Sequence, residues 1–158
     1  MNGTGAVALR RGGAGDRAFV LDLGRRTSVD SMSALRAAPP AMLQSSFEQL
    51  VDFTFERQYV LLIAERELDG PVGFLLMLDD LPDEVTAMPQ GFIAYMAVEP
   101  DARRLGIGVQ LLEAAENAAR VRGLPHMALM VTEDNDAARE LYAQAGYVTE
   151  RRLLCKPL

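Results

Sequence analysis

The chain has 158 residues, of which 49% are hydrophobic and 24% are charged. This is the balance of one globular domain rather than of a disordered or fibrous chain, and folding at this length buries about 68–70% of the unfolded surface. The single cysteine, Cys155, excludes an internal disulfide, and no apolar run approaches the roughly 18 residues of a membrane span. Because residues 1–8 lack the order of a secretion signal, we expect a cytoplasmic protein.

The net charge of −6 is unevenly distributed. Residues 1–40 contain six Arg and three Asp, residues 41–102 contain two Arg and twelve acidic residues, and residues 103–158 contain eight basic and seven acidic residues. Nucleic-acid binding needs clustered Lys and Arg, so the acidic middle argues against a general nucleic-acid binder. It favours a cationic partner, and a solvated acidic surface is the commoner explanation of the same charges.

The first half of the chain predicts an alternation of strands and helices. We expect residues 1–5 to be flexible and residues 6–158 to form one domain, beginning with a strand over 6–10 and a helix near 16–23. Pro39 and Pro40 precede a second helix, in which Leu43, Phe47, Leu50 and Thr54 recur at helical spacing.

An antiparallel strand pair and a long loop follow. The apolar runs 59–64 and 72–78 are joined by the turn signal Asp69-Gly70. Residues 79–90 contain two Pro and four acidic residues, which predicts an exposed loop long enough to have a function. The almost uncharged residues 91–98 predict a central strand that is buried on both faces.

The second half continues the alternation. Apolar residues at 107, 111, 114, 118 and 121 form one face of a helix, which Gly123 and Pro125 end. A strand over 126–131 precedes a helix that Asn135 caps and Gly146 closes. Two final strands are expected over 147–149 and 153–156.

The segment 96–109 carries the strongest functional signal. A buried strand leads through a short turn to a helix start, where unpaired backbone N–H groups attract anions. Gly106 and Gly108 allow a phosphate to approach the backbone, and Arg103 or Arg104 can add a charged contact. A P-loop would need Lys and Ser or Thr after Gly108, and the spacing of a dinucleotide fingerprint is also absent. A tight turn and close helix packing are the alternative explanation of the two glycines.

Two motifs together resemble those of a known family. Val98-x-Pro100 followed by Arg103-x-x-Gly106-x-Gly108 is similar to the acetyl-CoA signature of the GCN5-related N-acetyltransferase (GNAT) family. Asn135-x-x-Ala138-x-x-Leu141-Tyr142 and then Gly146-Tyr147 resemble the family's helix beside the coenzyme thiol. The resemblance covers about residues 91–147 and implies a single-domain α/β fold, with a mixed, mostly antiparallel sheet that is flanked by helices and splayed at its central strands.

The resemblance implies a role for particular residues. The backbone of Met96, Ala97 and Val98 would pair with the acetyl carbonyl and the pantetheine arm at a bulge in the strand. The pyrophosphate would be wrapped by the backbone of Arg103, Arg104, Leu105, Gly106, Ile107, Gly108 and Val109. Asn135 would bind the pantetheine arm and Tyr142 would protonate the departing thiolate. A plain helix cap at Asn135 and a plain core position for Tyr142 remain the alternatives.

A general base is harder to assign. Many family members resemble one another in having a glutamate on the central strand, whereas residues 91–94 contain no acid. Glu133 and Glu65 are candidates, with surface charge as the commoner explanation, and Tyr95 could line the site or order a water. An amine of low pKa would need no dedicated base. His126 and Cys155 have no ligand or catalytic pattern around them, so no metal and no covalent intermediate are expected.

The expected reaction is direct transfer of acetyl from the cosubstrate acetyl-CoA to a primary amine. The acceptor would be a small cationic amine or an amine of a peptide or protein, bounded by the first two helices, the loop 79–90 and the last strands. No nucleic-acid or membrane partner is expected, and a homodimer stays open. The alternative is a non-catalytic module that binds and senses acyl-CoA.

Overall fold

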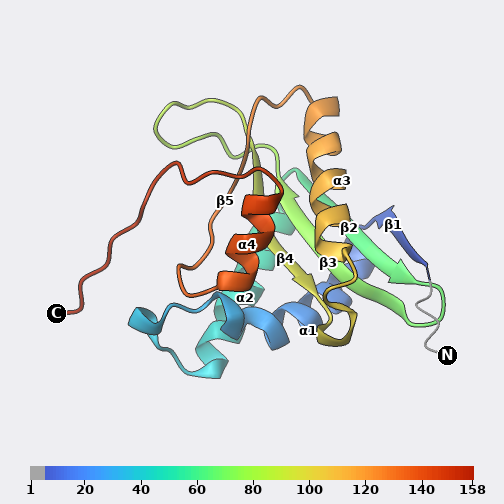
Figure 1. The fold of residues 1–158 in the computed structure, drawn as a ribbon, viewed down its shortest axis with the longest axis horizontal. Coiled ribbons are helices and arrows are strands. Elements are labelled where there is room, and N and C mark those ends of the chain that lie inside the picture. Colours follow the sequence, from blue (N-terminus) through green and yellow to red (C-terminus); the bar gives the residue numbers. More distant parts are fainter. Residues whose placement is uncertain (1–5) are drawn as a thin grey trace.

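The computed structural model describes residues 6–158, so the expected flexible segment 1–5 lies outside the described residues. One sheet has the strand order β1-β2-β3-β4-β5. Its strands are β1 (Val7–Arg11), β2 (Tyr59–Arg66), β3 (Gly70–Leu78), β4 (Gly91–Val98) and β5 (Met127–Leu129). Neighbouring strands are antiparallel from β1 to β4, and β5 is parallel to β4. The mixed sheet, with helices on both faces, confirms the predicted α/β fold (Figure 1).

Within residues 6–158, four α-helices cover the sheet. They are α1 (Arg17–Thr27), α2 (Pro40–Phe55), α3 (Ile107–Val121) and α4 (Asp136–Gln144). Helices α1 and α2 pack on one face, and α3 packs on the other with α4 beside it (Figure 1). The short turns η1 (Ala14–Asp16), η2 (Ser28–Ser31), η3 (Ala34–Arg36) and η4 (Pro100–Ala102) complete the regular structure. All four helices occur where the sequence predicts them, and α1 extends beyond the expected end at residue 23.

The alternation of side chains along each strand divides the core into two layers. In β2, Val60, Leu62 and Ala64 pack toward α3, whereas Leu61 and Ile63 pack toward α1 and α2. Successive side chains of a strand point to opposite faces, so helices on both faces require a continuous apolar run. The same pattern in β3 explains why residues 72–78 are all buried.

The buried face of α3 differs from the predicted one. Ile107 and Leu111 are buried as expected, and the face continues through Ala115 and Ala119 rather than through 114 and 118. Val121, which the spacing placed on this face, is 90% exposed. Steps of four residues keep the small alanines against the sheet along the whole helix.

The end of the chain also departs from the prediction. The expected strands at 147–149 and 153–156 do not form, and Val148, Leu153 and Leu154 are exposed. Strand β5 has only three residues and presents a short edge for pairing, and Arg151 pairs instead with Asp83 and Glu84 in the loop 79–90. Cys155 is exposed rather than part of a strand. Within residues 6–158, no helix is long and apolar enough to cross a membrane.

Candidate functional site

The sheet opens where β4 leaves β5. Strand β5 pairs with β4 only at Gly91–Ile93. Ala94 is an extra residue in the pairing with β3, because Leu76 lies opposite Tyr95 and Met77 lies opposite Ile93. Beyond this bulge, the β4 edge that faces away from β3 has no strand partner among the described residues, so β4 is half-buried rather than buried on both faces. The backbone of Met96–Val98 lies along this opening, and the bulge precedes it at Ala94.

The first turn of α3 follows the open part of β4 and has free backbone donors. The N-cap Gly106 has a left-handed backbone, with φ +75°, and no side chain caps the helix. Arg104 is also left-handed, with φ +64°, a conformation that favours glycine and occurs at functional turns. Within residues 6–158, the first backbone donor of α3 to find a carbonyl is Gln110, which donates to Gly106 at 3.1 Å. The N–H groups of residues 107–109 therefore remain available to an anion.

The two motif glycines have different roles. Gly106 has open space around its Cα, so its need for glycine comes from the backbone conformation. A Cβ at Gly108 would lie 3.0 Å from Leu141 Cδ2 and 3.9 Å from Met96 Cε. The absence of a side chain at Gly108 therefore lets α3 pack closely against α4 and β4. This agrees with the alternative explanation of Gly108, close helix packing.

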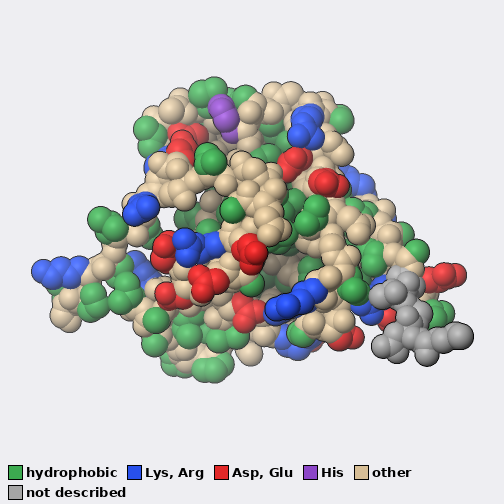
Figure 2. Space-filling model, viewed as in Figure 1, with side chains coloured by type: hydrophobic (Ala, Val, Ile, Leu, Met, Phe, Trp, Pro, Cys, Tyr) green, Lys and Arg blue, Asp and Glu red, His purple; other side chains and the backbone are tan. Residues whose placement is uncertain are grey.

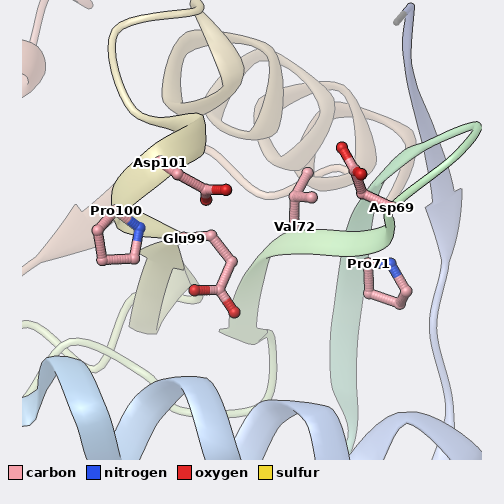
Figure 3. Close-up of a pocket in the computed structure, with 6 residues that line it drawn as sticks. All are labelled: Asp69, Pro71, Val72, Glu99, Pro100 and Asp101. Carbon is pink, nitrogen blue, oxygen red and sulfur yellow. The ribbon is translucent and has the colours of Figure 1, made fainter.

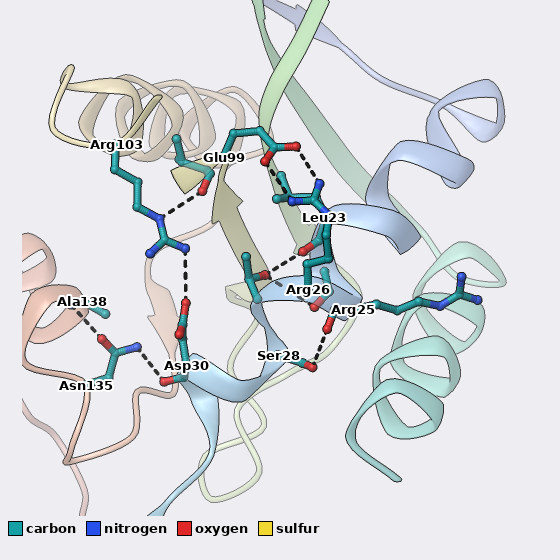
Figure 4. Close-up of polar contacts among 12 residues, drawn as sticks. Leu23, Arg25, Arg26, Ser28, Asp30, Glu99, Arg103, Asn135 and Ala138 are labelled. Atoms are coloured by element: carbon teal, nitrogen blue, oxygen red, sulfur yellow. Dashed lines mark hydrogen bonds and ion pairs between the residues drawn. The ribbon is translucent and has the colours of Figure 1, made fainter. Parts of the chain in front are cut away.

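The two motif arginines also differ. Arg103 donates through Nε to the Val98 carbonyl at 3.2 Å and through Nη2 to Asp30 at 3.2 Å (Figure 4). Arg104 is exposed and has no ion-pair partner in the part of the chain that the structure describes. Of the two predicted phosphate contacts, Arg104 is therefore free and Arg103 is engaged with the opposite side of the opening.

Asn135 caps α4 and also reaches across the opening. Its Oδ1 accepts from the backbone N–H of Ala138 at 3.2 Å, which confirms the helix-cap alternative, and its Nδ2 donates to the Asp30 carbonyl at 3.1 Å (Figure 4). Two more contacts join the same segments, because Thr132 Oγ1 donates to the Ser31 carbonyl at 2.5 Å and Asp134 accepts from the Ala34 N–H at 3.1 Å. The α1–α2 connection, residues 28–39, is thereby tied to residues 132–135.

Two phenols lie near the opening, one on α4 and one on β4. Tyr142 of α4 is half-buried beside the edge of the Tyr147 ring, at 5.9 Å between ring centroids. Burial raises the pKa of Tyr142, and the nearby Tyr95 adds to this rise. Burial also raises the pKa of Tyr95, whose hydroxyl lies 3.3 Å from Thr27 Oγ1. Both phenols therefore remain neutral, and able to donate a proton, at physiological pH.

The carboxylates that the sequence suggested as bases do not enter the opening. Glu133 has an 88% exposed side chain and pairs with Arg139 at 3.4 Å. Glu65 pairs with Arg10 at 2.7 Å on β2, two strands away from β4. Asp30, which the sequence analysis missed, lies close enough to raise the pKa of Tyr95. It belongs to no motif, and only the fold brings it to the opening.

An acidic hollow lies between the start of β3 and the turn that follows β4. It has a volume of about 420 Å³ and is lined by Asp69, Pro71, Val72, Glu99, Pro100 and Asp101 (Figure 3). Its three carboxylates would repel a pyrophosphate, so the free donors in the first turn of α3 suit an anion better than this hollow does. Within residues 6–158, no three His, Cys, Asp or Glu side chains are arranged to hold a metal ion.

The charge imbalance along the sequence is reduced in space. Arginines of the first forty residues pair with acids of the middle segment, as Arg10 does with Glu65 and Arg26 with Glu99, both at 2.7 Å. Arg17 pairs with Asp52, and Arg25 with Glu48. Figure 2 shows basic and acidic side chains side by side on one face of the molecule. The acidic middle segment therefore says little about the charge of the acceptor.

Comparison with known proteins gives the family. The model of the acetyltransferase (GNAT) family matches residues 30–147. The chain belongs to the GNAT family. It shares 30% identity over 118 residues with an aminoglycoside N(6′)-acetyltransferase type 1 of Klebsiella aerogenes, covering 73% of this chain and 78% of the relative. The chain also matches a GCN5-related N-acetyltransferase 7 of Arabidopsis thaliana and an acetyltransferase of Pectobacterium atrosepticum. These matches span less than half of the relatives' length, 48% of the first and 43% of the second.

Solved structures share the fold of this GNAT chain. An acetyl transferase of Pyrococcus furiosus has a TM-score of 0.83 at 23% identity, covering 97% of this chain and 100% of that one. An acetyltransferase of Clostridium acetobutylicum, solved with acetyl-CoA, has a TM-score of 0.67 at 19% identity and covers 96% of both chains. At these identities the likeness establishes the fold alone.

Proposed function

We propose that this GNAT protein transfers the acetyl group of acetyl-CoA directly to a primary amine of a small molecule, a peptide or a protein. The observation that carries the proposal is the uncapped first turn of α3, which follows the part of β4 that has left β5. A strand edge with unpaired backbone groups and a helix start with free N–H groups suit a ligand that has an amide arm at one end and a diphosphate at the other.

In this proposal, the backbone of residues 103–109 holds the pyrophosphate, with Arg104 adding charge. The edge of Met96–Val98, which has no strand partner within residues 6–158, binds the pantetheine arm and the acetyl carbonyl. Acetyl-CoA supplies an activated thioester when bound. The protein contributes position and donors aimed at the oxygen where negative charge develops during attack by the amine.

Tyr142 is the proposed general acid. A thiolate that leaves the tetrahedral intermediate needs a proton, and the parent thiol has a pKa of about 8.5 if it resembles cysteine. The raised pKa of Tyr142 keeps the phenol protonated, and the half-buried ring comes from α4 beside the opening. Transfer from a phenol with an ordinary pKa of about 10 to this thiolate is uphill by about 2 kcal/mol, and the raised pKa of Tyr142 adds to that cost, which is small beside the whole barrier of the reaction.

The incoming amine must lose a proton before it attacks. For an amine with a pKa of about 10.4, deprotonation at pH 7 costs about 4.6 kcal/mol. Glu133 remains a predicted base, but its exposure and its pairing with Arg139 make it poorly placed. Asp30 is the second candidate, because it lies on the opening and is 49% exposed against 88% for Glu133, and its pair with Arg103 would have to break before it accepts a proton.

A non-catalytic acyl-CoA sensor is the second candidate function. Residues 91–94 of β4 contain no carboxylate that could serve as a base. Arg103 also occupies the Val98 carbonyl, and Asn135 is engaged with Asp30 and Ala138. A sensor would bind acetyl-CoA and release no thiol in the presence of amines.

Calorimetry with CoA and a thiol-release assay over a panel of primary amines test the two functions. We expect CoA to bind and at least one amine to accelerate thiol release from acetyl-CoA. Binding without amine-dependent release would favour the sensor. The absence of any heat or thermal stabilisation with millimolar CoA would contradict both functions.

A charge substitution locates the phosphate site. Val109 is 39% exposed in the first turn of α3, and Val121 is 90% exposed in the last turn of the same helix. Val109→Glu places a negative charge beside the free donors and should weaken CoA binding, while Val121→Glu should leave it unchanged. Gly108→Glu is a poorer probe, because its side chain would enter the contact with Leu141. Equal CoA affinity in both valine variants would move the phosphate site elsewhere.

A further inference from the structure

A second hollow lies between η2, α2 and β4. It has a volume of about 210 Å³, and its apolar lining is Met32, Leu43, Phe47, Leu50 and Tyr95. The remaining lining consists of three serines, at positions 28, 31 and 46. An apolar cavity of about 150 Å³ can hold benzene, so this hollow has room for an aromatic ring or a short branched chain.

None of the residues that line this hollow is charged. The acidic residues Glu48 and Asp52 of α2 are outside the lining and are paired with Arg25 and Arg17 of α1. A serine hydroxyl can accept a hydrogen bond but does not compensate a desolvated ammonium group. The hollow therefore favours an uncharged apolar group over a second cation.

Tyr95 connects the hollow to the opening of the sheet. Its ring packs against Phe47 at 4.6 Å between centroids and forms one wall of the hollow. Its hydroxyl lies 3.3 Å from Thr27 Oγ1, and its backbone belongs to the part of β4 that has left β5. A ligand that fills the hollow thus lies against the strand that borders the opening.

We propose that this hollow binds the non-reacting part of the acceptor, and that the acceptor is a primary amine with an apolar chain or ring and no second cation. The proposal rests on the proposed acetyl transfer, because it assigns the acceptor of that same site. It differs from the cationic acceptor that the acidic segment 41–102 suggested. The acidic side chains of that segment nearest the hollow in the sequence, Glu48 and Asp52, are already paired with arginines and give no support to a cationic acceptor.

Two amines that differ in one terminal charge provide the test. Pentylamine and 1,5-diaminopentane have the same chain length, and only the second carries an ammonium group at its far end. With the wild-type protein, we expect kcat/KM for pentylamine to exceed that for the diamine, per amine, by about 10-fold or more. Binding of each amine to the protein–CoA complex is measured in parallel by calorimetry, so that the hollow is assessed even without turnover.

Ser46 and Ser45 offer a matched pair of variants. Both are exposed on α2, but only Ser46 lines the hollow. Ser46→Asp should reduce kcat/KM and affinity for pentylamine by about 10-fold and improve those for 1,5-diaminopentane, because the new carboxylate can pair with its far ammonium. Ser45→Asp should keep the wild-type preference.

The outcomes separate the two proposals. Pentylamine binding with the expected variant pattern but no thiol release would support the hollow and contradict the proposed acetyl transfer. Turnover with equal use of the two amines, or with the same response in Ser46→Asp and Ser45→Asp, would overturn the apolar acceptor and leave acetyl transfer intact. Absence of both amine binding and turnover would overturn the apolar acceptor as well.

Discussion

The guanidinium of Arg103 lies 3.2 Å from the carboxylate of Asp30, which joins the loop before α3 to the α1–α2 connection (Figure 4). Both side chains are nearly half exposed, so the pair contributes at most about 1 kcal/mol and weakens with salt. A diphosphate with two or more charges is a stronger partner for Arg103 than one exposed carboxylate. We therefore expect coenzyme binding and the position of the α1–α2 connection to be coupled through this arginine.

Removing the Asp30 carboxylate should strengthen coenzyme binding. In Asp30→Ala, Arg103 no longer has to leave a partner, so we expect CoA affinity to rise by up to about fivefold, the equivalent of 1 kcal/mol. Calorimetry at low and high salt measures this, and the gain should shrink at high salt. Asp134→Ala is the control, since it breaks the contact with Ala34 without touching Arg103. An equal gain in both variants would attribute the effect to loosening of the connection.

Tyr142 and Tyr147 allow the acid role to be tested against plain packing. Their rings contact each other in the same cluster. Burial raises the pKa of both phenols, and Tyr95 adds to the rise for Tyr142 but not for Tyr147. Tyr142→Phe should lower kcat by about 100-fold or more with unchanged CoA affinity. Tyr147→Phe should retain turnover. Steady-state kinetics and CoA calorimetry on both variants decide, and equal losses would assign the effect to the packing of α4.

The sequence predicts most of the architecture because its signals are local. A left-handed backbone at Gly106 can be predicted from the turn motif alone, because such a conformation favours glycine whatever the surrounding fold. The apolar runs of β2 and β3 likewise indicate strands that are covered on both faces. The resemblance to GNAT proteins rests on two such local motifs, and the family match confirms it.

The remaining features depend on distant contacts. Asp30 belongs to no motif and becomes part of the site because Asn135 binds its carbonyl from 105 residues away. The segment 153–156 has the alternation of a strand but finds no partner, since β5 stops at Leu129. The apolar hollow combines residues of η2, α2 and β4, which are far apart in the sequence, so no local pattern predicts it. Counting charges segment by segment along the sequence also overstates the local charge of the folded protein, because ion pairs join segments of opposite charge.

The crossing of α1 and α2 depends on Gly24. A Cβ at this position would lie 1.9 Å from Cζ of the buried Phe47. Gly24→Ala should therefore destabilise the protein by about 1–3 kcal/mol through overpacking, and thermal unfolding should show a lower Tm. Gly15→Ala is the matched control, because a Cβ there meets nothing within 4 Å. Gly24→Ala combined with Phe47→Leu should recover part of the loss, and equal Tm values for the two alanine variants would contradict this packing.

The buried hydroxyl of Tyr147 should make the protein sensitive to alkali. It has no hydrogen-bond partner within residues 6–158, and burial, with a smaller contribution from Glu116, raises its pKa to about 12. Between pH values of about 10 and 12, the unfolded chain loses this proton while the folded chain retains it, so the free energy of unfolding falls as pH rises. Tyr142 and Tyr95, whose pKa values burial also raises, act in the same direction.

Urea unfolding at pH 8, 10 and 11 measures this loss. We expect wild-type stability to decline above pH 10 by up to about 1.4 kcal/mol per pH unit for each buried phenol. Tyr147→Phe should match or slightly exceed the wild type at pH 8, because it removes an unpartnered buried hydroxyl. Its decline above pH 10 should be shallower. Parallel curves for the two proteins would mean that Tyr147 ionises as readily in the folded chain as in the unfolded one, which would require its hydroxyl to reach water.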